Sequence, residues 1–225
     1  MKIYLIIPAS NEASAIGNLV CAARKYVPDI LVIDDGSKDN TAEIAEKNGA
    51  QVIRFEHNLG KGACLIEGYR QGLKKGFDAV ISMDGDGQHH PDDLPAFLIA
   101  AGDEQNALII GNRMNNAKNM PLIRFLTNRL MSWIISLVTK QSIPDTQCGF
   151  RLVKRKLLED INLVTSNYDM ESELLIKASR RGFKIKSVPI RTIYGSEISK
   201  INPLLDTFRF IHLMARDFFR KFKHD

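Results

Sequence analysis

The 225-residue sequence has few cysteines, no long hydrophobic run and only a small excess of one charge. Its three cysteines, Cys21, Cys64 and Cys148, lie far apart without CxxC spacing, which argues against a disulfide framework and a zinc site. The longest hydrophobic stretch, LMSWIISLV at 130–138, falls far short of the roughly 20 residues that cross a bilayer. The opening MKIYLIIPASNE has too few apolar residues for a signal peptide. We therefore expect a cytoplasmic protein without a transmembrane helix.

The charge excess is mild but unevenly placed. Lysine and arginine number 31 against 26 aspartates and glutamates, for a net charge of +5. Cations concentrate at 113–129 and 209–223, where acids are few. This distribution favours anionic ligands or a membrane surface as partners, and nothing in it indicates nucleic acid.

Short β-branched runs alternate with segments of helical periodicity. The runs are IYLII (3–7), ILVID (30–34), QVIRF (51–55), AVISM (79–83) and ALIIG (107–111). Because continuously apolar strands are buried on both faces, the pattern predicts a single α/β domain with a Rossmann-like, mostly parallel central sheet flanked by helices. The first helix is expected to take Ser10 or Asn11 as its N-cap, and the second Asp39 or Asn40, with Gly49 just past its end.

Unusual polar residues follow three of the predicted strands. They are the segment from Pro8 to Glu12, the pair Asp34 and Asp35, and the segment from Asp84 to Gln88. Ligands of open parallel sheets bind outside the carboxyl ends of the strands. We therefore expect the three segments to form one acidic edge that binds a ligand.

The stretch MDGDGQHH places Asp84 and Asp86 two residues apart, with a glycine between them. Carboxylates so spaced can converge on a hard cation such as Mg²⁺ or Mn²⁺, with a diphosphate completing the octahedron and Gln88 as a neutral oxygen ligand. His89 and His90 are less favoured as ligands, since a loop histidine is more often solvent-exposed. The alternative is a turn with solvated acids.

The segments IIPASNEASAI, LVIDDGSKDNT, HNLGKGACLIEGYRQG, ISMDGDGQHHPDDLP, GNRM and DTQCGFRLVKR resemble, in this order, the family 2 inverting glycosyltransferases of the GT-A fold. The likeness is strongest to the branch of dolichyl-phosphate mannosyltransferase and other polyprenyl-phosphate glycosyltransferases, and it covers residue 3 to about 200. It implies a nucleotide-sugar-binding half at 1–112, an acceptor half at 113–200 and a C-terminal basic amphipathic helix at 201–225.

The resemblance also implies roles for residues of the first half. Pro8, Ser10 and Glu12 contact the base and ribose of a nucleoside diphosphate sugar, and Asp35 closes the same pocket. Glu12 can instead simply favour the start of its helix. Lys61 matches the residue before the third helix, or is an ordinary exposed lysine. The site residues Asp84, Asp86 and Gln88 map onto the metal site, and the donor is of the GDP-mannose or UDP-glucose type.

Arg113 matches an arginine that faces the phosphates, and Arg124 and Arg129 match basic residues that hold an acceptor phosphate. Guanidinium groups bind phosphate oxygens bidentately, although either helix arginine can instead extend along a surface. A phosphate acceptor, such as polyprenyl phosphate, attacks the sugar unaided, whereas a glycan hydroxyl needs a base. The base candidates are Asp145 and Glu171, whose alternatives are a turn cap and a first-turn helix acid.

The C-terminal segment 204–225 combines apolar residues at helical spacing with five cations. Such a helix can contact a membrane peripherally or pack on the domain. Ser199 and Lys200 match an SK motif near the acceptor, but the arginine common a few residues earlier is absent, as are the C-terminal membrane segments of some relatives. We therefore expect sugar transfer to polyprenyl phosphate, with a glycan hydroxyl as alternative acceptor and a non-catalytic nucleotide- or cation-binding regulatory module as the rival class.

Overall fold

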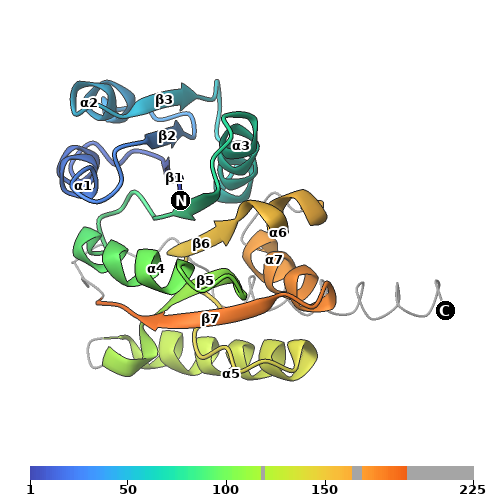
Figure 1. Cartoon of the computed structure of the whole chain (residues 1–225). Coiled ribbons are helices and arrows are strands. Elements are labelled where there is room, and N and C mark those ends of the chain that lie inside the picture. Colours follow the sequence, from blue (N-terminus) through green and yellow to red (C-terminus); the bar gives the residue numbers. More distant parts are fainter. Residues whose placement is uncertain (118–119, 164–168, 192–225) are drawn as a thin grey trace.

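The centre of the fold is a seven-stranded sheet (Figure 1). The computed structural model describes residues 1–117, 120–163 and 169–191. The strands are β1 (Ile3–Ala9), β2 (Ile30–Asp34), β3 (Gln51–Arg54), β4 (Ala79–Ser82), β5 (Asn106–Asn112), β6 (Arg151–Lys154) and β7 (Lys184–Pro189). Their order across the sheet is β3-β2-β1-β4-β6-β5-β7.

Most neighbouring strands are parallel, as predicted. β1 pairs in parallel with β2 and β4, β2 with β3, and β5 with β7. β6 runs antiparallel between β4 and β5. In the register, Ala9 lies opposite Asp34 and Ile6 lies opposite Ser82. The carboxyl ends of β1, β2 and β4 therefore meet at one edge of the sheet.

Helices cover both faces of the sheet. They are α1 (Ile16–Ala23), α2 (Thr41–Lys47), α3 (Lys61–Lys74), α4 (Leu94–Ala101), α5 (Leu122–Thr139), α6 (Arg155–Asp160) and α7 (Asp169–Arg180), with short 3₁₀ turns η1 (Pro91–Asp93) and η2 (Met114–Asn116). Figure 1 shows α1, α2 and α4 on one side of the sheet and α3, α6 and α7 on the other. α5 packs against α7. This arrangement confirms the predicted α/β class.

The strands are apolar because helices cover the sheet. Every residue of β2, β4, β5 and β6 is buried, and β1 is buried from Tyr4 to Ala9. The outermost strands, β3 and β7, carry exposed residues along their length. Burial on both faces therefore explains the hydrophobic runs in β1, β2, β4 and β5, whereas β6 buries a cation at each of its ends, Arg151 and Lys154.

The start of α1 differs from the prediction. The helix begins at Ile16, and neither Ser10 nor Asn11 caps it. Asn11 has a left-handed φ of 58°, and its side-chain oxygen accepts a hydrogen bond from Lys38 N at 2.8 Å. Its own N–H donates to Ser37 Oγ at 2.9 Å. Tertiary bonds to the loop after β2 therefore outweigh the local capping preference.

The second helix agrees more closely with the sequence. Asp39 Oδ1 accepts a hydrogen bond from Thr41 N at 3.1 Å, at the first residue of α2. Gly49, just past its end, has a φ of 89°, a conformation that favours glycine. Asn40 occupies the N-cap position without a side-chain hydrogen bond, so of the two predicted caps Asp39 is the one that bonds the helix, and the predicted glycine after its end is confirmed.

The predicted residues Ser199 and Lys200 and the predicted C-terminal helix at 201–225 lie outside the described residues. Within the described ranges, no helix combines the length and the apolar character that crossing a membrane requires.

Candidate active site

The loops after β1 and β2 interlock with the segment that precedes α3. Asp35, which is buried, accepts hydrogen bonds from Leu59 N at 2.7 Å and from Gly60 N at 3.0 Å. Ser10 Oγ accepts a hydrogen bond from Asn58 Nδ2 at 3.3 Å. Both carboxylate oxygens of Asp35 are thus engaged within the protein, so this residue shapes the predicted nucleotide pocket by holding the 59–60 turn.

Other residues predicted for the nucleotide differ in exposure. Pro8 is a buried residue of β1, whereas Ser10 and Glu12 are partly exposed beyond the strand end. The N–H of Glu12 donates to Thr41 Oγ1 at 2.8 Å, which ties this loop to the start of α2. Ser10 and Glu12 are therefore placed where a ligand can reach them, and Pro8 can contribute only through its position in the strand.

The loop after β4 folds tightly against the end of β1. Gly85 N donates to Pro8 O at 3.2 Å, and a Cβ at Gly85 would approach that oxygen to 2.9 Å. Asp86 Oδ1 accepts a hydrogen bond from Gln88 N at 3.0 Å, and Asp86 is partly exposed. The glycine between the two aspartates therefore allows a close approach that brings them to the shared edge of the sheet.

A lysine lies between two carboxylates beside this loop. Lys61 Nζ is 2.6 Å from Asp84 Oδ1 and 3.0 Å from Glu171 Oε1, which joins the start of α3 to the loop after β4 and to α7. A Cβ at Gly149 would come within 2.6 Å of both Lys61 Nζ and Asp84 Oδ2. A side chain at this position would therefore displace the Asp84 carboxylate or the Lys61 ammonium. The reading of Lys61 as an ordinary exposed lysine is wrong, since its side chain is only 20% exposed.

The charges in this trio stabilise one another. Burial alone would raise the pKa of Asp84, but the nearby charges, chiefly Lys61, lower it to about 2. Burial would lower the pKa of Lys61, whereas Asp84 and Glu171 raise it. Asp84 and Lys61 therefore remain charged at neutral pH, with the lysine placed between the carboxylates of Asp84 and Glu171.

His89 is buried beside the same loop. Its Nδ1 accepts a hydrogen bond from Asp84 N at 3.2 Å, and its ring lies 5.2 Å from that of Phe150, centre to centre. Burial lowers the pKa of His89, although the charges of Asp84 and Asp86 oppose this shift. The histidine therefore supports the loop as a neutral ring, with its Nδ1 used inside the protein.

A second ion pair lies deeper, between the end of β5 and the loop before β6. Arg113 Nε and Nη2 each donate to Asp145 at 2.8 Å, and Arg113 N donates to the same carboxylate at 3.0 Å. Asn128 Nδ2 of α5 adds a fourth hydrogen bond at 2.8 Å. Burial would raise the pKa of Asp145, but Arg113 and Asn128 lower it.

This network argues against two predicted roles. A carboxylate that accepts four hydrogen bonds and has a lowered pKa is a weak base, so the base role of Asp145 is not supported by its surroundings. Arg113 directs one edge of its guanidinium at Asp145, which leaves fewer of its N–H groups to bind a phosphate. Glu171, the other base candidate, is likewise paired with Lys61.

The three predicted arginines are not brought to one point. Arg124 is partly buried on α5, one helical turn before Asn128 and therefore on the same side of the helix. Arg129 is exposed, and as the neighbour of Asn128 it is turned about 100° away. Arg124 therefore fits the acceptor side better than Arg129 does.

Sequence reasoning missed Arg151 and Asn128. Arg151 is 1% exposed and donates to the carbonyl oxygens of Thr146, Cys148 and Glu171 at 2.6–2.7 Å. It thereby joins the loop before β6 to α7. The position of Arg151 directly after the apolar CGF segment was a signal in the sequence for a buried cation, whereas no sequence pattern marked Asn128.

The residues present fit a divalent ion that a ligand completes. Among the described residues, no group of three or more histidine, cysteine, aspartate or glutamate side chains forms a complete metal cage. Asp86 has one carboxylate oxygen bonded by a backbone N–H and is partly exposed. Asp84 and Asp86 can therefore supply two oxygens of a site that needs the diphosphate of a donor for the rest.

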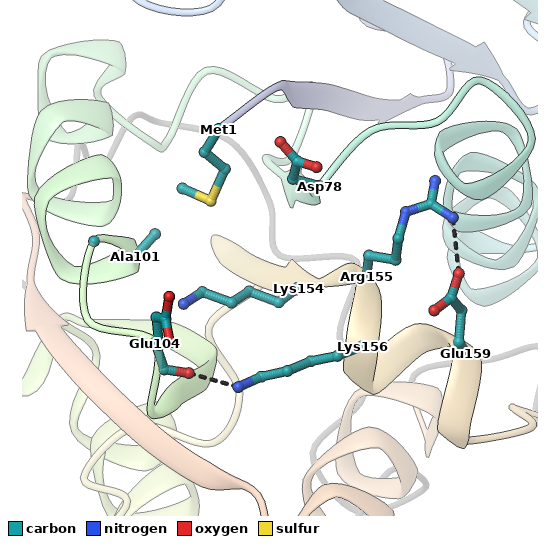
Figure 2. A pocket seen from close by; sticks show the side chains of 9 residues that line it. Met1, Asp78, Ala101, Glu104, Lys154, Arg155, Lys156 and Glu159 are labelled. Atoms are coloured by element: carbon teal, nitrogen blue, oxygen red, sulfur yellow. Dashed lines mark hydrogen bonds and ion pairs between the residues drawn. The ribbon is translucent and has the colours of Figure 1, made fainter.

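A separate surface pocket lies at the opposite edge of the sheet, where β1 and β4 begin (Figure 2). Its cations already have partners. Lys154 Nζ donates to Asp103 O at 2.8 Å, Lys156 to Glu104 O, and Arg155 pairs with Glu159. Figure 2 shows these cations beside acidic side chains. The balanced charges and the position at the amino ends of the strands do not indicate a second ligand site.

Comparisons with known proteins agree with the resemblance seen in the sequence. The model of the family "Glycosyl transferase family 2" matches residues 4–162. A UDP-N-acetylglucosamine–dolichyl-phosphate N-acetylglucosaminyltransferase of Methanococcus voltae is 34% identical over 85% of this chain and 86% of the relative. An undecaprenyl-phosphate mannosyltransferase of Micrococcus luteus is 31% identical over 84% of this chain and 83% of the relative.

Solved structures show the same fold. Glucosyl-3-phosphoglycerate synthase of Mycobacterium tuberculosis, in complex with Mn²⁺, UDP and glucosyl-3-phosphoglycerate, has a TM-score of 0.70. The match covers 88% of this chain and 73% of that one, at 21% identity. At this identity the likeness concerns the fold alone, and it confirms the expected GT-A architecture.

Proposed function

The chain belongs to glycosyl transferase family 2 and is a glycosyltransferase, and from this premise we propose that it moves a hexose from a nucleoside diphosphate sugar to a polyprenyl phosphate with inversion at the sugar carbon. The proposal places the reaction at the cytoplasmic face of a membrane and includes Mg²⁺ or Mn²⁺ as cofactor. Membership of an enzyme family sets aside the rival reading as a non-catalytic regulatory module.

The names of the relatives support a lipid phosphate as acceptor. Two of them are named for transfer to dolichyl phosphate and to undecaprenyl phosphate, with N-acetylglucosamine and mannose as the sugars. Since these sugars differ, the relatives do not choose between donors, and a GDP-mannose or UDP-glucose type of donor remains our proposal.

The observation that carries the choice of acceptor is that both base candidates are held by cations. Asp145 is bonded to Arg113, and Glu171 is bonded to Lys61. A sugar hydroxyl must lose its proton to a base before or during attack, whereas a phosphate monoester is already anionic at neutral pH. Transfer to phosphate therefore suits a site whose carboxylates are engaged.

In the proposed reaction, an oxygen of the acceptor phosphate attacks C1 of the sugar from the side opposite the leaving group. The bond between C1 and the diphosphate oxygen breaks, and its electron pair stays with the nucleoside diphosphate. No proton needs to move. Asp84 and Asp86 would hold a divalent ion, which would supply positive charge to stabilise this leaving group.

The chain's own residues position the reactants. In this proposal Ser10 and Glu12 contact the nucleoside, next to the 59–60 turn that Asp35 holds. Lys61 keeps Asp84 charged and correctly placed beside Gly149. On the acceptor side, Arg124 lies on the face of α5 that carries Asn128, and its guanidinium is suited to the acceptor phosphate.

Transfer assays test this proposal directly. The purified protein is incubated with UDP-glucose, GDP-mannose or UDP-N-acetylglucosamine, Mg²⁺ or Mn²⁺, and either a short-chain polyprenyl phosphate or an alkyl glycoside. We expect a polyprenyl-phosphate sugar, identified by mass spectrometry, and loss of the product in EDTA. A product found only with the alkyl glycoside would overturn the choice of acceptor, and undiminished transfer in EDTA would remove the metal.

A further inference from the structure

The outward side of α5 is covered by large apolar side chains. Of the ten large hydrophobic side chains that are exposed among the described residues, seven lie on this helix. Five of them recur at intervals of three or four residues and are each more than half exposed: Leu122, Leu126, Leu130, Trp133 and Leu137. Residues so spaced form one stripe along a helix, which we call the outer face of α5.

The opposite side of the same helix is buried and combines polar residues with the core residues Met131 and Ile135. Asn128 donates to Asp145 at 2.8 Å, and Ser132 Oγ accepts a hydrogen bond from Thr146 N at 3.0 Å. Ser136 Oγ accepts one from Ile143 N at 3.0 Å. A helix on a domain surrounded by water usually turns its apolar stripe inward. α5 instead turns a strong apolar stripe outward, and covering that stripe with another apolar surface would be favourable.

Charge identifies the kind of surface that covers this face. No aspartate or glutamate occurs between Glu104 and Asp145, whereas the interval contains Arg113, Lys118, Arg124, Arg129 and Lys140. An apolar stripe in a purely cationic segment is complementary to an anionic bilayer, into which leucines and a tryptophan insert while cations meet the headgroups. The segment 209–223 of this chain and a second copy of α5 are both rich in cations, so either would meet like charge.

We propose that the outer face of α5 binds in the interface of an anionic lipid bilayer, with the helix lying in the membrane plane. The 18 residues of α5 span about 27 Å, and the helix does not meet the requirements of a membrane span. The inner side carries Asn128, which bonds to Asp145 and hence lies next to Arg113. Binding through the outer face therefore brings this part of the candidate site to the bilayer surface, where a lipid phosphate is found.

Trp133 is the only tryptophan in the sequence, so the native full-length protein reports on this face. Its fluorescence is recorded, without donor or acceptor, as vesicles of phosphatidylcholine or of phosphatidylcholine with phosphatidylglycerol are added. We expect a blue shift and protection from acrylamide quenching with the anionic vesicles, and a much smaller change with the neutral ones. Because no transfer is measured, this result is independent of the proposed reaction.

Two variants make the test specific. Leu126→Glu and Leu130→Glu place charge on the outer face, and each is expected to weaken co-sedimentation with anionic vesicles by roughly tenfold or more. Ile99→Glu is the matched control, since Ile99 is an exposed hydrophobic residue on α4, and its vesicle binding is expected to equal that of the wild type. Leu126, Leu130 and Ile99 are all exposed, so we expect the three variants to fold, and their melting temperatures check this.

Three results would overturn the proposal. Vesicle binding by Leu126→Glu and Leu130→Glu equal to that of the wild type would assign the membrane contact to another part of the chain. Trp133 already protected from acrylamide without lipid would show that the protein's own chain covers the face. Protection that rises with protein concentration would assign the face to contact between copies.

Discussion

Two ion pairs of this molecule have nearly the same length and very different surroundings. Lys61 and Asp84 are 2.6 Å apart, with side chains 20% and 26% exposed. Arg113 and Asp145 are 2.8 Å apart, with side chains 7% and 0% exposed. The first pair is a point charge beside a glycine loop, and the second is a bidentate pair closed by Asn128. Partial exposure and an ammonium that meets each carboxylate at one oxygen suit exchange with a ligand, whereas a buried, bidentate pair suits a fixed structural element.

The largest effect is expected from removing one partner of the buried Arg113–Asp145 pair. Asp145→Ala leaves the Arg113 guanidinium buried without its carboxylate, which typically costs about 3–5 kcal/mol of unfolding free energy. Urea unfolding measures the loss. The control is Glu159→Ala, which removes an exposed pair with Arg155 of equal length and is expected to cost less than about 1 kcal/mol. Equal losses in the two variants would show that the Arg113–Asp145 pair is not a structural element.

A substitution of Asp86, in the loop after β4, is expected to affect activity and not stability. Asp86 is partly exposed, and one backbone N–H bonds to its side chain. Asp86→Asn keeps an oxygen for that bond and removes the charge, so we expect sugar transfer to fall about 100-fold while the melting temperature stays the same. Steady-state kinetics and thermal unfolding measure the two effects. Unchanged transfer would remove the metal role from Asp86, and a large loss of stability would make the residue structural.

Acid should weaken the Lys61–Asp84 pair in a defined range of pH. The pKa of Asp84 is lowered from its usual 3.8 to about 2 in the folded protein. A group with a lowered folded pKa stabilises the protein above its unfolded pKa, and this contribution is lost as pH falls toward the folded value. We expect about 2 kcal/mol of unfolding free energy to be lost between about pH 4 and pH 2. Asp84→Asn should flatten that part of the pH profile, and an unaltered profile would contradict the assignment.

The strands and the acidic loops were predictable because their signals are local. Apolar runs marked β1, β2, β4 and β5, and the acids after three of the predicted strands marked the carboxyl edge of the sheet. The ion pairs were not predictable, since Lys61 and Glu171, like Arg113 and Asp145, come from separate elements. Their partners depend on how α3, α5 and α7 pack, and no pattern within one segment encodes that packing.

The same reason explains the residues whose expected roles changed. Asn11 had the chemistry of a helix cap, but hydrogen bonds to Ser37 and Lys38 use it elsewhere. Asp35, which was expected to close the nucleotide pocket, bonds through both carboxylate oxygens to the backbone of Leu59 and Gly60, and its contact with a nucleotide stays a prediction. Residue type indicated the edge where these side chains act, and tertiary contacts decided which of them remain available to a ligand.

The smallest expected effect distinguishes an exchangeable cation from a fixed one. Lys61→Met removes the charge that separates Asp84 from Glu171, so the two carboxylates repel each other in the donor-free protein. A divalent ion can then replace the missing charge, and we expect Mn²⁺ to raise the melting temperature of Lys61→Met by about 2–4 °C more than that of the wild type. Lys61→Arg, which keeps the charge, is the matched control and should behave like the wild type. Equal Mn²⁺ shifts in Lys61→Met and the wild type would mean that the lysine and the ion do not share this space, and the contrast between the two ion pairs would then rest on exposure alone.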